Sequence, residues 1–217
     1  GVLQKEAMMR FFQVNRDIFL RTLCLVTVTL FFTSAGASQG EIILAVNTLL
    51  MQLFTLFSYV MDGFAYAGEA LSGRYIGARN RKAFTNTTRH LFIWGGWLAA
   101  FFTLVYALGG NAFLGLLTDN KDVVSAAGTY FYWALAIPVA GIAAFIWDGI
   151  FIGATATRGM LASMAIAAIS FFVVYYGLRP VLGNHALWLA FLVYLAMRGV
   201  VQTLLSPKII KENFTQP

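Results

Sequence analysis

Six long apolar segments run through this 217-residue chain, each of them long enough to cross a lipid bilayer. A transmembrane helix needs about 20 mainly apolar residues to span the hydrocarbon layer. Because hydrophobic residues make up 59% of the chain and charged residues only 11%, the composition excludes a water-soluble domain. The pattern predicts an all-α membrane protein with one six-helix transmembrane bundle. The expected spans are residues 17–36, 43–70, 91–110, 124–146, 159–178 and 186–205.

The segments between these spans are short and polar. Residues 73–90 form an expected basic loop, and residues 111–122 an expected polar loop. A connection rich in glycine and threonine covers residues 147–158. No stretch has the composition of a soluble domain. The start on Gly1 suggests a piece of a longer protein, and processing or trimming of the N-terminus would give the same start.

The composition also excludes several classes of function. The net charge of +6 is spread over the segments between spans, without the basic, aromatic-rich face of a nucleic-acid-binding protein. Cys24 is the only cysteine, so the sequence predicts neither a disulfide framework nor a cysteine-based metal site. His90 and His185 fall at opposite ends of the expected bundle. Without a metal-ligand cluster, a phosphate-binding glycine loop or a nucleophile beside a base, the sequence argues against an enzyme and predicts no cofactor and no metal.

Lysines and arginines are distributed unevenly between the two sides of the predicted bundle. One side carries only Lys121 and Arg179. The other side carries Lys5, Arg10, Arg16, Arg74, Arg79, Arg81, Lys82, Arg89, Arg158, Lys208 and Lys211. Positively charged residues collect on the cytoplasmic side of membrane proteins. We therefore expect both termini in the cytoplasm and a multi-pass protein of the cell inner (plasma) membrane.

The second expected span carries a continuous polar stripe on one face. The stripe consists of Thr48, Gln52, Thr55, Tyr59, Asp62, Tyr66 and Glu69. Steps of four and three residues alternate along it, which at about 100° per residue keeps all seven side chains together. A carboxylate at membrane depth costs about 3 kcal/mol on insertion scales, so it normally faces a cavity or a partner. We expect the stripe to be the wall of a pathway, with hydroxyl and amide groups that suit loose recognition of varied solutes.

The two carboxylates of the stripe lie at different depths. Glu69 comes shortly before Arg74, so we expect it to make a structural ion pair near the cytoplasmic surface. Asp62 lies about two turns deeper. There it either ties neighbouring helices together or faces the pathway, and the spacing favours neither role.

Charged residues on other spans are expected to make structural ion pairs on the cytoplasmic side. Asp17 and Arg21 are one turn apart on the first span, a spacing that allows a pair on one helical face. Asp148 ends the fourth span and Arg158 begins the fifth. We expect these two side chains to pair across the short connection and to hold the cytoplasmic turn.

Two residues inside the later spans stand out. Arg198 lies about two turns within the last span. It either reaches back to the cytoplasmic surface or pairs with an acid, with Glu69 and Asp148 as candidates. Pro138 lies inside the fourth span, where a proline frees a backbone carbonyl and bends the helix. We expect a kink at Pro138 and a candidate hinge.

Two motifs resemble those of a known transporter family. Residues 62–74, DGFAYAGEALSGR, running on to Gly77 and Ala78, are similar to the DG…A…EAL.G…GA motif of multidrug and toxic compound extrusion (MATE) transporters. Residues 147–158, WDGIFIGATATR, resemble the connection after the tenth helix in the DinF-like branch. The order and loop lengths of all six spans fit the second half of such a protein. The resemblance therefore covers essentially the whole chain.

The resemblance implies one half of a twelve-helix protein. Family members have two six-helix lobes related by an axis along the membrane normal. This chain would be the C-terminal lobe, helices seven to twelve, and its partner would be the missing N-terminal lobe. The family implies an antiporter in the lipid bilayer that expels small organic, often cationic, substrates in exchange for protons or sodium.

The resemblance favours protons as the coupling ion over sodium. In the sodium-coupled branch, the C-terminal lobe has acids within its seventh and tenth helices. The corresponding stretches here, residues 22–33 and 126–144, contain none. In the DinF-like branch, the proton-linked aspartate belongs to the first helix, which this chain lacks. Asp62 is therefore not expected to replace it.

The favoured hypothesis is the C-terminal lobe of a proton-coupled multidrug efflux antiporter that works by alternating access. The expected cavity-lining residues are Thr48, Gln52, Thr55, Tyr59, Asp62 and Tyr66, and the expected cytoplasmic-side ion-pair residues are Glu69, Arg74, Asp148, Arg158 and Arg198. One alternative is a flippase of related architecture for lipid-linked saccharides. It would need a strongly cationic cavity, for which only Arg21 and Arg198 are candidates. Another alternative is a non-transporting membrane subunit or a fragment.

Overall fold

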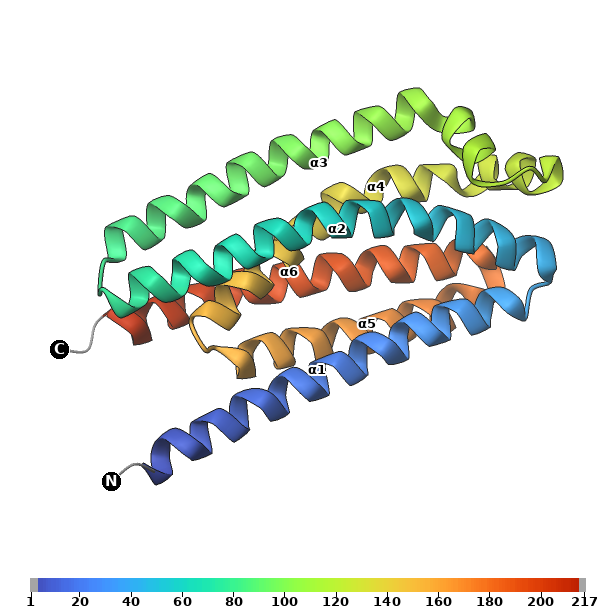
Figure 1. Cartoon of the computed structure of the whole chain (residues 1–217). Coiled ribbons are helices and arrows are strands. Elements are labelled where there is room, and N and C mark those ends of the chain that lie inside the picture. The colour runs from blue at the N-terminus through green and yellow to red at the C-terminus, as the bar shows by residue number, and fades with distance from the viewer. Residues whose placement is uncertain (1–3, 215–217) are drawn as a thin grey trace.

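A computed structural model describes residues 4–214 as six α-helices that run along one bundle (Figure 1). The helices are α1 (Lys5–Ala37), α2 (Glu41–Gly77), α3 (Arg81–Leu117), α4 (Lys121–Gly153), α5 (Thr157–Leu182) and α6 (Asn184–Phe214). Each is long and apolar enough to cross a membrane. The predicted fold class is confirmed, and each expected span lies within one helix. Gly1 lies outside the described residues.

The helices extend well beyond the predicted spans, which corrects the expected loops. Segment 73–90 is almost entirely helical, because α2 continues to Gly77 and α3 already begins at Arg81. Helix α3 also runs through the first part of segment 111–122. Hydropathy marks only the stretch that matches the hydrocarbon layer of about 30 Å, whereas a helix as long as α2 reaches about 55 Å. The charged ends stay helical because lysine and arginine are good helix formers.

Local signals place the ends of these helices. Asn80 precedes α3, and its side-chain oxygen accepts a hydrogen bond from the Ala83 N–H at 3.0 Å. Asn120 caps α4 in the same way, accepting from the Asp122 N–H at 3.0 Å. Such side chains satisfy amides that have no partner within the helix. The connections between helices are therefore short, and neighbours along the chain run antiparallel (Figure 1).

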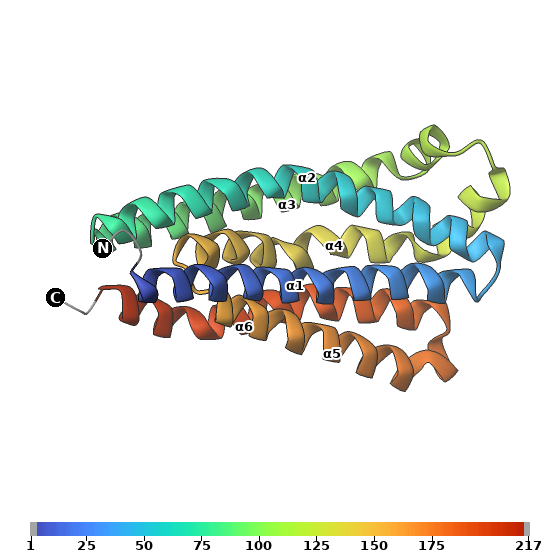
Figure 2. The ribbon, with the colours of Figure 1, turned by 60° about the horizontal axis from the view of Figure 1, so that its bottom comes forward.

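Helix α4 is the centre of the bundle. It packs against α2, α3, α5 and α6, and every residue from Ala144 to Phe151 is buried. Helices α1 and α3 lie at the periphery, with α1 packed along α5 and α2 (Figures 1 and 2). The C-terminal third of α4 is therefore a place where a polar side chain is enclosed by neighbouring helices.

The crossing of α2 and α4 depends on two glycines spaced four residues apart. A Cβ atom on Gly149 would lie 2.1 Å from the Ala65 carbonyl oxygen, and one on Gly153 would lie 2.4 Å from the Glu69 carbonyl oxygen. Small residues at this spacing let membrane helices approach backbone to backbone. The close approach brings the polar stripe of α2 beside Asp148 on α4.

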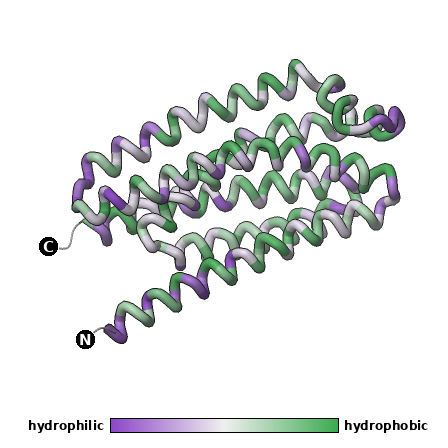
Figure 3. Tube along the Cα trace, in the orientation of Figure 1, coloured by the Kyte–Doolittle hydropathy of each residue, from purple (hydrophilic) through white to green (hydrophobic). Residues whose placement is uncertain are grey.

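The two ends of the bundle differ in their polar residues. Both described ends of the chain lie at the end that holds the α2–α3 turn (Figure 1). Hydrophilic residues gather at the helix ends, and apolar ones between them (Figure 3). At the opposite end, the buried amides of Asn47 and Asn184 exchange hydrogen bonds of 2.9 and 2.8 Å. The Trp188 indole also donates to Asn47 at 3.0 Å, which ties α2 to α6.

Candidate functional site

The stripe on α2 lies on the surface of this bundle. Tyr59 and Tyr66 expose 69% and 71% of their surface, and Asp62 is also exposed. The half-buried Thr55 hydroxyl donates to the Met51 carbonyl of its own helix at 3.0 Å. Thr48 and Gln52 are exposed as well, whereas Glu69 is half-buried, so most of the stripe is accessible from outside the bundle.

Members of the stripe border two hollows between α1 and α2. Thr48, Gln52 and Thr55 line a hollow of about 200 Å³ towards the end that holds the Asn47–Asn184 pair. Asp62 and Glu69 line a second one of about 360 Å³, which we call the Asp62 cavity. Its walls are Arg21, Leu25, Phe54, Ser58, Asp62, Ala65, Tyr66, Glu69, Phe145, Asp148, Gly149, Ile152 and Arg198.

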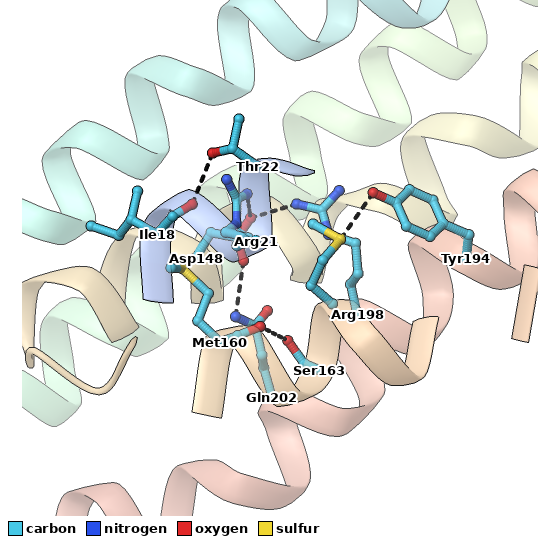
Figure 4. Close-up of polar contacts among 10 residues, drawn as sticks. Ile18, Arg21, Thr22, Asp148, Met160, Ser163, Tyr194, Arg198 and Gln202 are labelled. Atoms are coloured by element: carbon cyan, nitrogen blue, oxygen red, sulfur yellow. Dashed lines mark hydrogen bonds and ion pairs between the residues drawn. The ribbon is translucent and has the colours of Figure 1, made fainter. Parts of the chain in front are cut away.

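A buried charge cluster forms the inner wall of the Asp62 cavity (Figure 4). Asp148 accepts hydrogen bonds from Arg21 of α1 at 2.6 Å and from Arg198 of α6 at 2.5 Å. Its second oxygen accepts from the Gln202 amide at 2.9 Å. Asp148 exposes 7% of its surface, Arg198 4% and Gln202 none. One carboxylate on the central helix therefore joins α1, α4 and α6.

Aromatic rings complete the environment of Arg198. Its guanidinium carbon lies 5.9 Å from the centre of the Phe145 ring and 5.6 Å from that of Tyr194. A cation over an aromatic face is attracted by the ring's negative face, more strongly where water is excluded. Carboxylate and rings together explain how a charged side chain is held inside the bundle.

The charge cluster retains unused hydrogen-bonding capacity. Arg21 Nε, Arg198 Nε and Gln202 Oε1 are buried atoms without a hydrogen-bond partner. A buried polar atom without a partner costs about 1–3 kcal/mol. Two guanidiniums also face a single carboxylate at this point. Arg21 and Arg198 also line the Asp62 cavity, so positive charge of the cluster borders it.

The expected pairing of Asp148 with Arg158 across the α4–α5 connection was wrong. Asp148 pairs with Arg21 and Arg198 instead of Arg158, because α4 continues to Gly153 and Asp148 lies inside it. Arg158 is exposed in the first turn of α5. With the Gln13 amide turned so that its oxygen faces Arg158, Gln13 accepts from Nε of that residue at 2.5 Å.

The predicted Asp17–Arg21 pair is not formed either. Arg21 turns towards Asp148. Asp17, also on α1, is fully buried and lies against the start of α5. The Thr157 hydroxyl donates to Asp17 at 3.0 Å, and Arg16 lies 3.4 Å from its other oxygen. Asp17 therefore ties α1 to α5, and it leaves Arg21 free for α4.

Arg198 pairs with Asp148, one of the two acids expected as its partner, and does not reach back to the cytoplasmic surface. Glu69 lines the Asp62 cavity and Arg74 is exposed, its guanidinium carbon 6.0 Å from the centre of the Tyr75 ring. Within residues 4–214, Glu69, Arg74 and Arg158 make no ion pair. From the set expected on the cytoplasmic side, Asp148 and Arg198 form an ion pair, and Glu69 lines the same cavity as these two residues.

Pro138 lies buried inside α4, ten residues before Asp148. The Thr103 hydroxyl of α3 donates to the Leu135 carbonyl at 3.3 Å, within the turn that precedes the proline. A neighbouring hydroxyl commonly satisfies backbone groups that an intramembrane proline disturbs. Helix α4 runs continuously through Pro138, and the contacted carbonyl is next to that of Ala134, which the proline leaves without its N–H partner; the kink and the hinge stay predictions.

Two residues of the charge cluster were not assigned to it from the sequence. Arg21 lies one turn from Asp17, so the spacing pointed to the nearer acid. Gln202 was not singled out, although it follows Arg198 by four residues and shares its helical face. That spacing is the one signal in the sequence that links Gln202 to the cluster.

Comparison with known proteins identifies the family. The MatE family model matches residues 18–181. DNA damage-inducible protein F of Escherichia coli (strain K12) is 43% identical over 191 residues, covering 88% of this chain and 41% of that protein. Protein DETOXIFICATION 42 of Arabidopsis thaliana is 24% identical over 198 residues, covering 89% of this chain and 38% of that protein. The chain thus spans about two fifths of the length of these relatives.

A solved structure has the same fold. The crystal structure of MATE in the bent conformation superposes with a TM-score of 0.73 at 17% identity, covering 93% of this chain and 44% of that one. The six-helix arrangement is therefore found within a longer MATE protein. Together with the match over residues 18–181 and the identity to the E. coli protein, it shows that the chain is a DinF-like member of the MatE family of membrane transporters.

Proposed function

We propose that this chain is the C-terminal lobe of an antiporter that expels small organic compounds across the membrane. The Asp62 cavity carries the proposal, because polar and charged side chains from α1, α2, α4 and α6 meet there in an otherwise apolar bundle. Intramembrane ionisable residues normally mark a substrate or ion pathway. The partner is a second six-helix lobe that faces the open side of α1 and α2.

The exposed stripe is the proposed substrate surface. Thr48, Gln52, Thr55, Tyr59, Asp62 and Tyr66 offer aromatic rings and hydrogen-bonding groups with a single fixed charge. An aromatic face attracts organic cations, and a carboxylate beside it strengthens that preference. Organic cations are therefore the proposed substrate class.

Protons are the proposed coupling ion, and alternating access is the proposed mechanism. The proposal rests on the family resemblance, with sodium the less favoured ion. Bending of α4 near Pro138 would move Asp148 relative to α1 and α6, which hold Arg21 and Arg198. Because these contacts join three helices, a movement of α4 would also displace α1 and α6. Neither proposed step uses a catalytic residue or a bound cofactor.

The bundle is proposed to lie in the cell inner (plasma) membrane with both termini in the cytoplasm. Helix ends at α1, the α2–α3 turn and α6 bring Lys5, Arg81 and Lys208 to one end of the molecule. The other end carries Lys121 and Arg179. This distribution supports the orientation through the positive-inside rule.

Dye efflux from membrane vesicles tests the proposal. The chain is joined to the sequence encoded upstream of it, and efflux driven by a proton gradient is compared between the joined protein and the 217-residue chain alone. We expect gradient-dependent efflux only from the joined protein. Efflux by the short chain would show instead that it forms its own second lobe, as a homodimer. No efflux from a folded joined protein would refute the antiporter.

A flippase for lipid-linked saccharides is a second candidate, because Arg21 and Arg198 line the same cavity. Two guanidiniums there could bind a pyrophosphate-linked cargo. Three carboxylates, Asp62, Glu69 and Asp148, line the cavity as well and offset those charges. In the same vesicles, transfer of a fluorescent pyrophosphate lipid between leaflets, without dye efflux, would favour the flippase.

A further inference from the structure

A second cavity lies at the basic end of the bundle, between the start of α1, the start of α5 and the end of α6. It has a volume of about 400 Å³ and shares no lining residue with the Asp62 cavity. Each of the three helices contributes one cation to its wall, namely Arg10, Arg158 and Lys208. We call it the basic cavity.

Little negative charge within the protein offsets these three cations. Glu212 also lines the basic cavity, but its carboxylate lies 4.0 Å from Lys208, at the outer limit of an ion pair. Within residues 4–214, neither Arg10 nor Arg158 forms an ion pair with a carboxylate. Asp17 is near in sequence, yet its two oxygens bond to Thr157 and Arg16. An excess of positive charge therefore remains at one point.

The wall of the basic cavity also contains apolar side chains, beside the polar Gln13, Thr155 and Thr157. Val14 of α1 and Leu205 and Ile209 of α6 line it. A ligand that suits this arrangement carries an anionic group next to an apolar body. A free phosphate ion would leave the apolar part of the wall in contact with water. The phosphate of an anionic phospholipid would satisfy both parts at once.

We propose that the basic cavity binds the phosphate group of an anionic phospholipid. Clusters of arginine and lysine between transmembrane helices at the cytoplasmic side recognise anionic lipid headgroups. The guanidiniums of Arg10 and Arg158 and the ammonium of Lys208 contact the phosphate oxygens, and Val14, Leu205 and Ile209 contact the glycerol and the first acyl carbons. The bound lipid joins α1, α5 and α6 at the end where α1 extends furthest from the bundle (Figure 1).

Native mass spectrometry of the detergent-solubilised 217-residue chain tests this site. The chain is exposed to phosphatidylglycerol or to phosphatidylcholine, and the fraction that retains lipid is measured over a range of lipid concentrations. We expect preferential retention of phosphatidylglycerol. Arg158→Gln and Lys208→Gln should each weaken it about fivefold, the effect of one basic residue near an anionic lipid. Circular dichroism identifies any variant that has failed to fold. If Arg158→Gln does not fold, the lipid retention of Lys208→Gln decides whether the site exists.

Arg81→Gln is the matched control, because Arg81 is an exposed arginine at the same end of the bundle but is not in the wall of the basic cavity. It should retain the lipid as the unmodified chain does. Equal retention of the two lipids, or an equal loss in Arg81→Gln, would overturn the site. Displacement by glycerol phosphate at the same concentration as the lipid would overturn the lipid as its occupant, because it would show that a soluble phosphate suffices.

Discussion

Within residues 4–214, Asp148 is the one carboxylate that forms ion pairs with both guanidiniums of the charge cluster. It is 7% exposed, and it contacts Arg21 at 2.6 Å and the buried Arg198 at 2.5 Å. Charged groups in an apolar interior are stable only when they are paired and hydrogen-bonded. Removing its negative charge would leave two guanidiniums without the carboxylate with which they pair. Asp148 is therefore the most sensitive member of the cluster.

The first prediction concerns Asp148→Asn. Breaking a buried ion pair by removing one partner costs about 3–5 kcal/mol, so we expect a loss of about that size in the free energy of unfolding. The measurement is the midpoint of SDS-induced unfolding of the 217-residue chain. Asp119→Asn, at an exposed aspartate, should stay within about 0.5 kcal/mol of the unmodified chain. Equal midpoints for the two variants would show that the cluster does not stabilise the fold.

Asp62 has the opposite environment, and its substitution should have the opposite effect. It is exposed on α2, lines the Asp62 cavity and, within residues 4–214, makes no ion pair. In the joined protein, Asp62→Asn should keep the yield near that of the unmodified protein while dye efflux falls about tenfold, the effect of one lost contact of about 1.4 kcal/mol. Efflux per folded molecule is the quantity to measure.

Glu41→Gln is the matched control for Asp62→Asn, because it removes an exposed carboxylate at the other end of the same helix. Its efflux should be unchanged. A low yield of Asp62→Asn with normal efflux by the protein that survives would show that Asp62 only ties helices together. That outcome would remove Asp62 from the proposed substrate surface.

At the scale of the helices, the approach of α2 to α4 places the stripe beside the charge cluster. Both contacts are between a glycine of α4 and a backbone carbonyl of α2, so no side-chain rotation can relieve a collision there. Any Cβ atom at Gly149 or Gly153 has to push the two helices apart. The Asp62 cavity, which both helices line, would change its shape in consequence.

A prediction follows for Gly149→Ala. The added Cβ would meet the Ala65 carbonyl at 2.1 Å, and overpacking of this kind costs about 1–3 kcal/mol. The SDS unfolding midpoint should fall accordingly. Gly96→Ala on α3 is the control, since nothing lies within 4 Å of its Cβ position and alanine is the better helix former. If Gly149→Ala unfolds no earlier than Gly96→Ala, the two helices do not depend on this contact.

The helices could be predicted from the sequence, but their extent and their partners could not. Apolar runs identify the stretch inside the hydrocarbon layer, whereas helices such as α2 and α3 continue into water with charged residues. Periodicity likewise shows which residues of α2 share a face. It cannot show which helix another face meets, because this depends on segments far apart in the sequence.

Ion pairs illustrate the same limit. Asp148 was expected to pair with Arg158, ten residues away, and was one of two candidate acids for Arg198. Its partners are Arg21 and Arg198, which are 127 and 50 residues distant. Proximity in the sequence favours Arg158 as the partner of Asp148. Because Asp148 is buried on the central helix, its partners are instead cations whose side chains enter the interior of the bundle. Burial was not visible in the sequence, since α4 is apolar on nearly every side.

The whole molecule is an uneven bundle, with a buried α4, peripheral α1 and α3, and a polar face on α2 that residues 4–214 leave mostly exposed. Large apolar side chains are exposed elsewhere, for example Trp94 and Trp97 on α3 and Leu108 near its end. Such a surface suits lipid on its apolar sides. The polar face of α2 suits a second lobe, in agreement with relatives more than twice as long as this chain.

The orientation of the molecule in the membrane gives the last prediction. Cys24 is the only cysteine, so Cys24→Ser provides a background for single cysteines at Thr85, at the basic end, or Ser125, at the opposite end; both positions are exposed. Because basic residues stay on the cytoplasmic side, a membrane-impermeant maleimide should label Ser125→Cys in intact cells and Thr85→Cys only after permeabilisation. The reverse labelling pattern would show that the bundle has the opposite orientation in the membrane. The basic cavity would then face lipid of the outer leaflet. Labelling of both positions in intact cells would mean that the chain inserts in both orientations, and the distribution of lysines and arginines would not determine its topology.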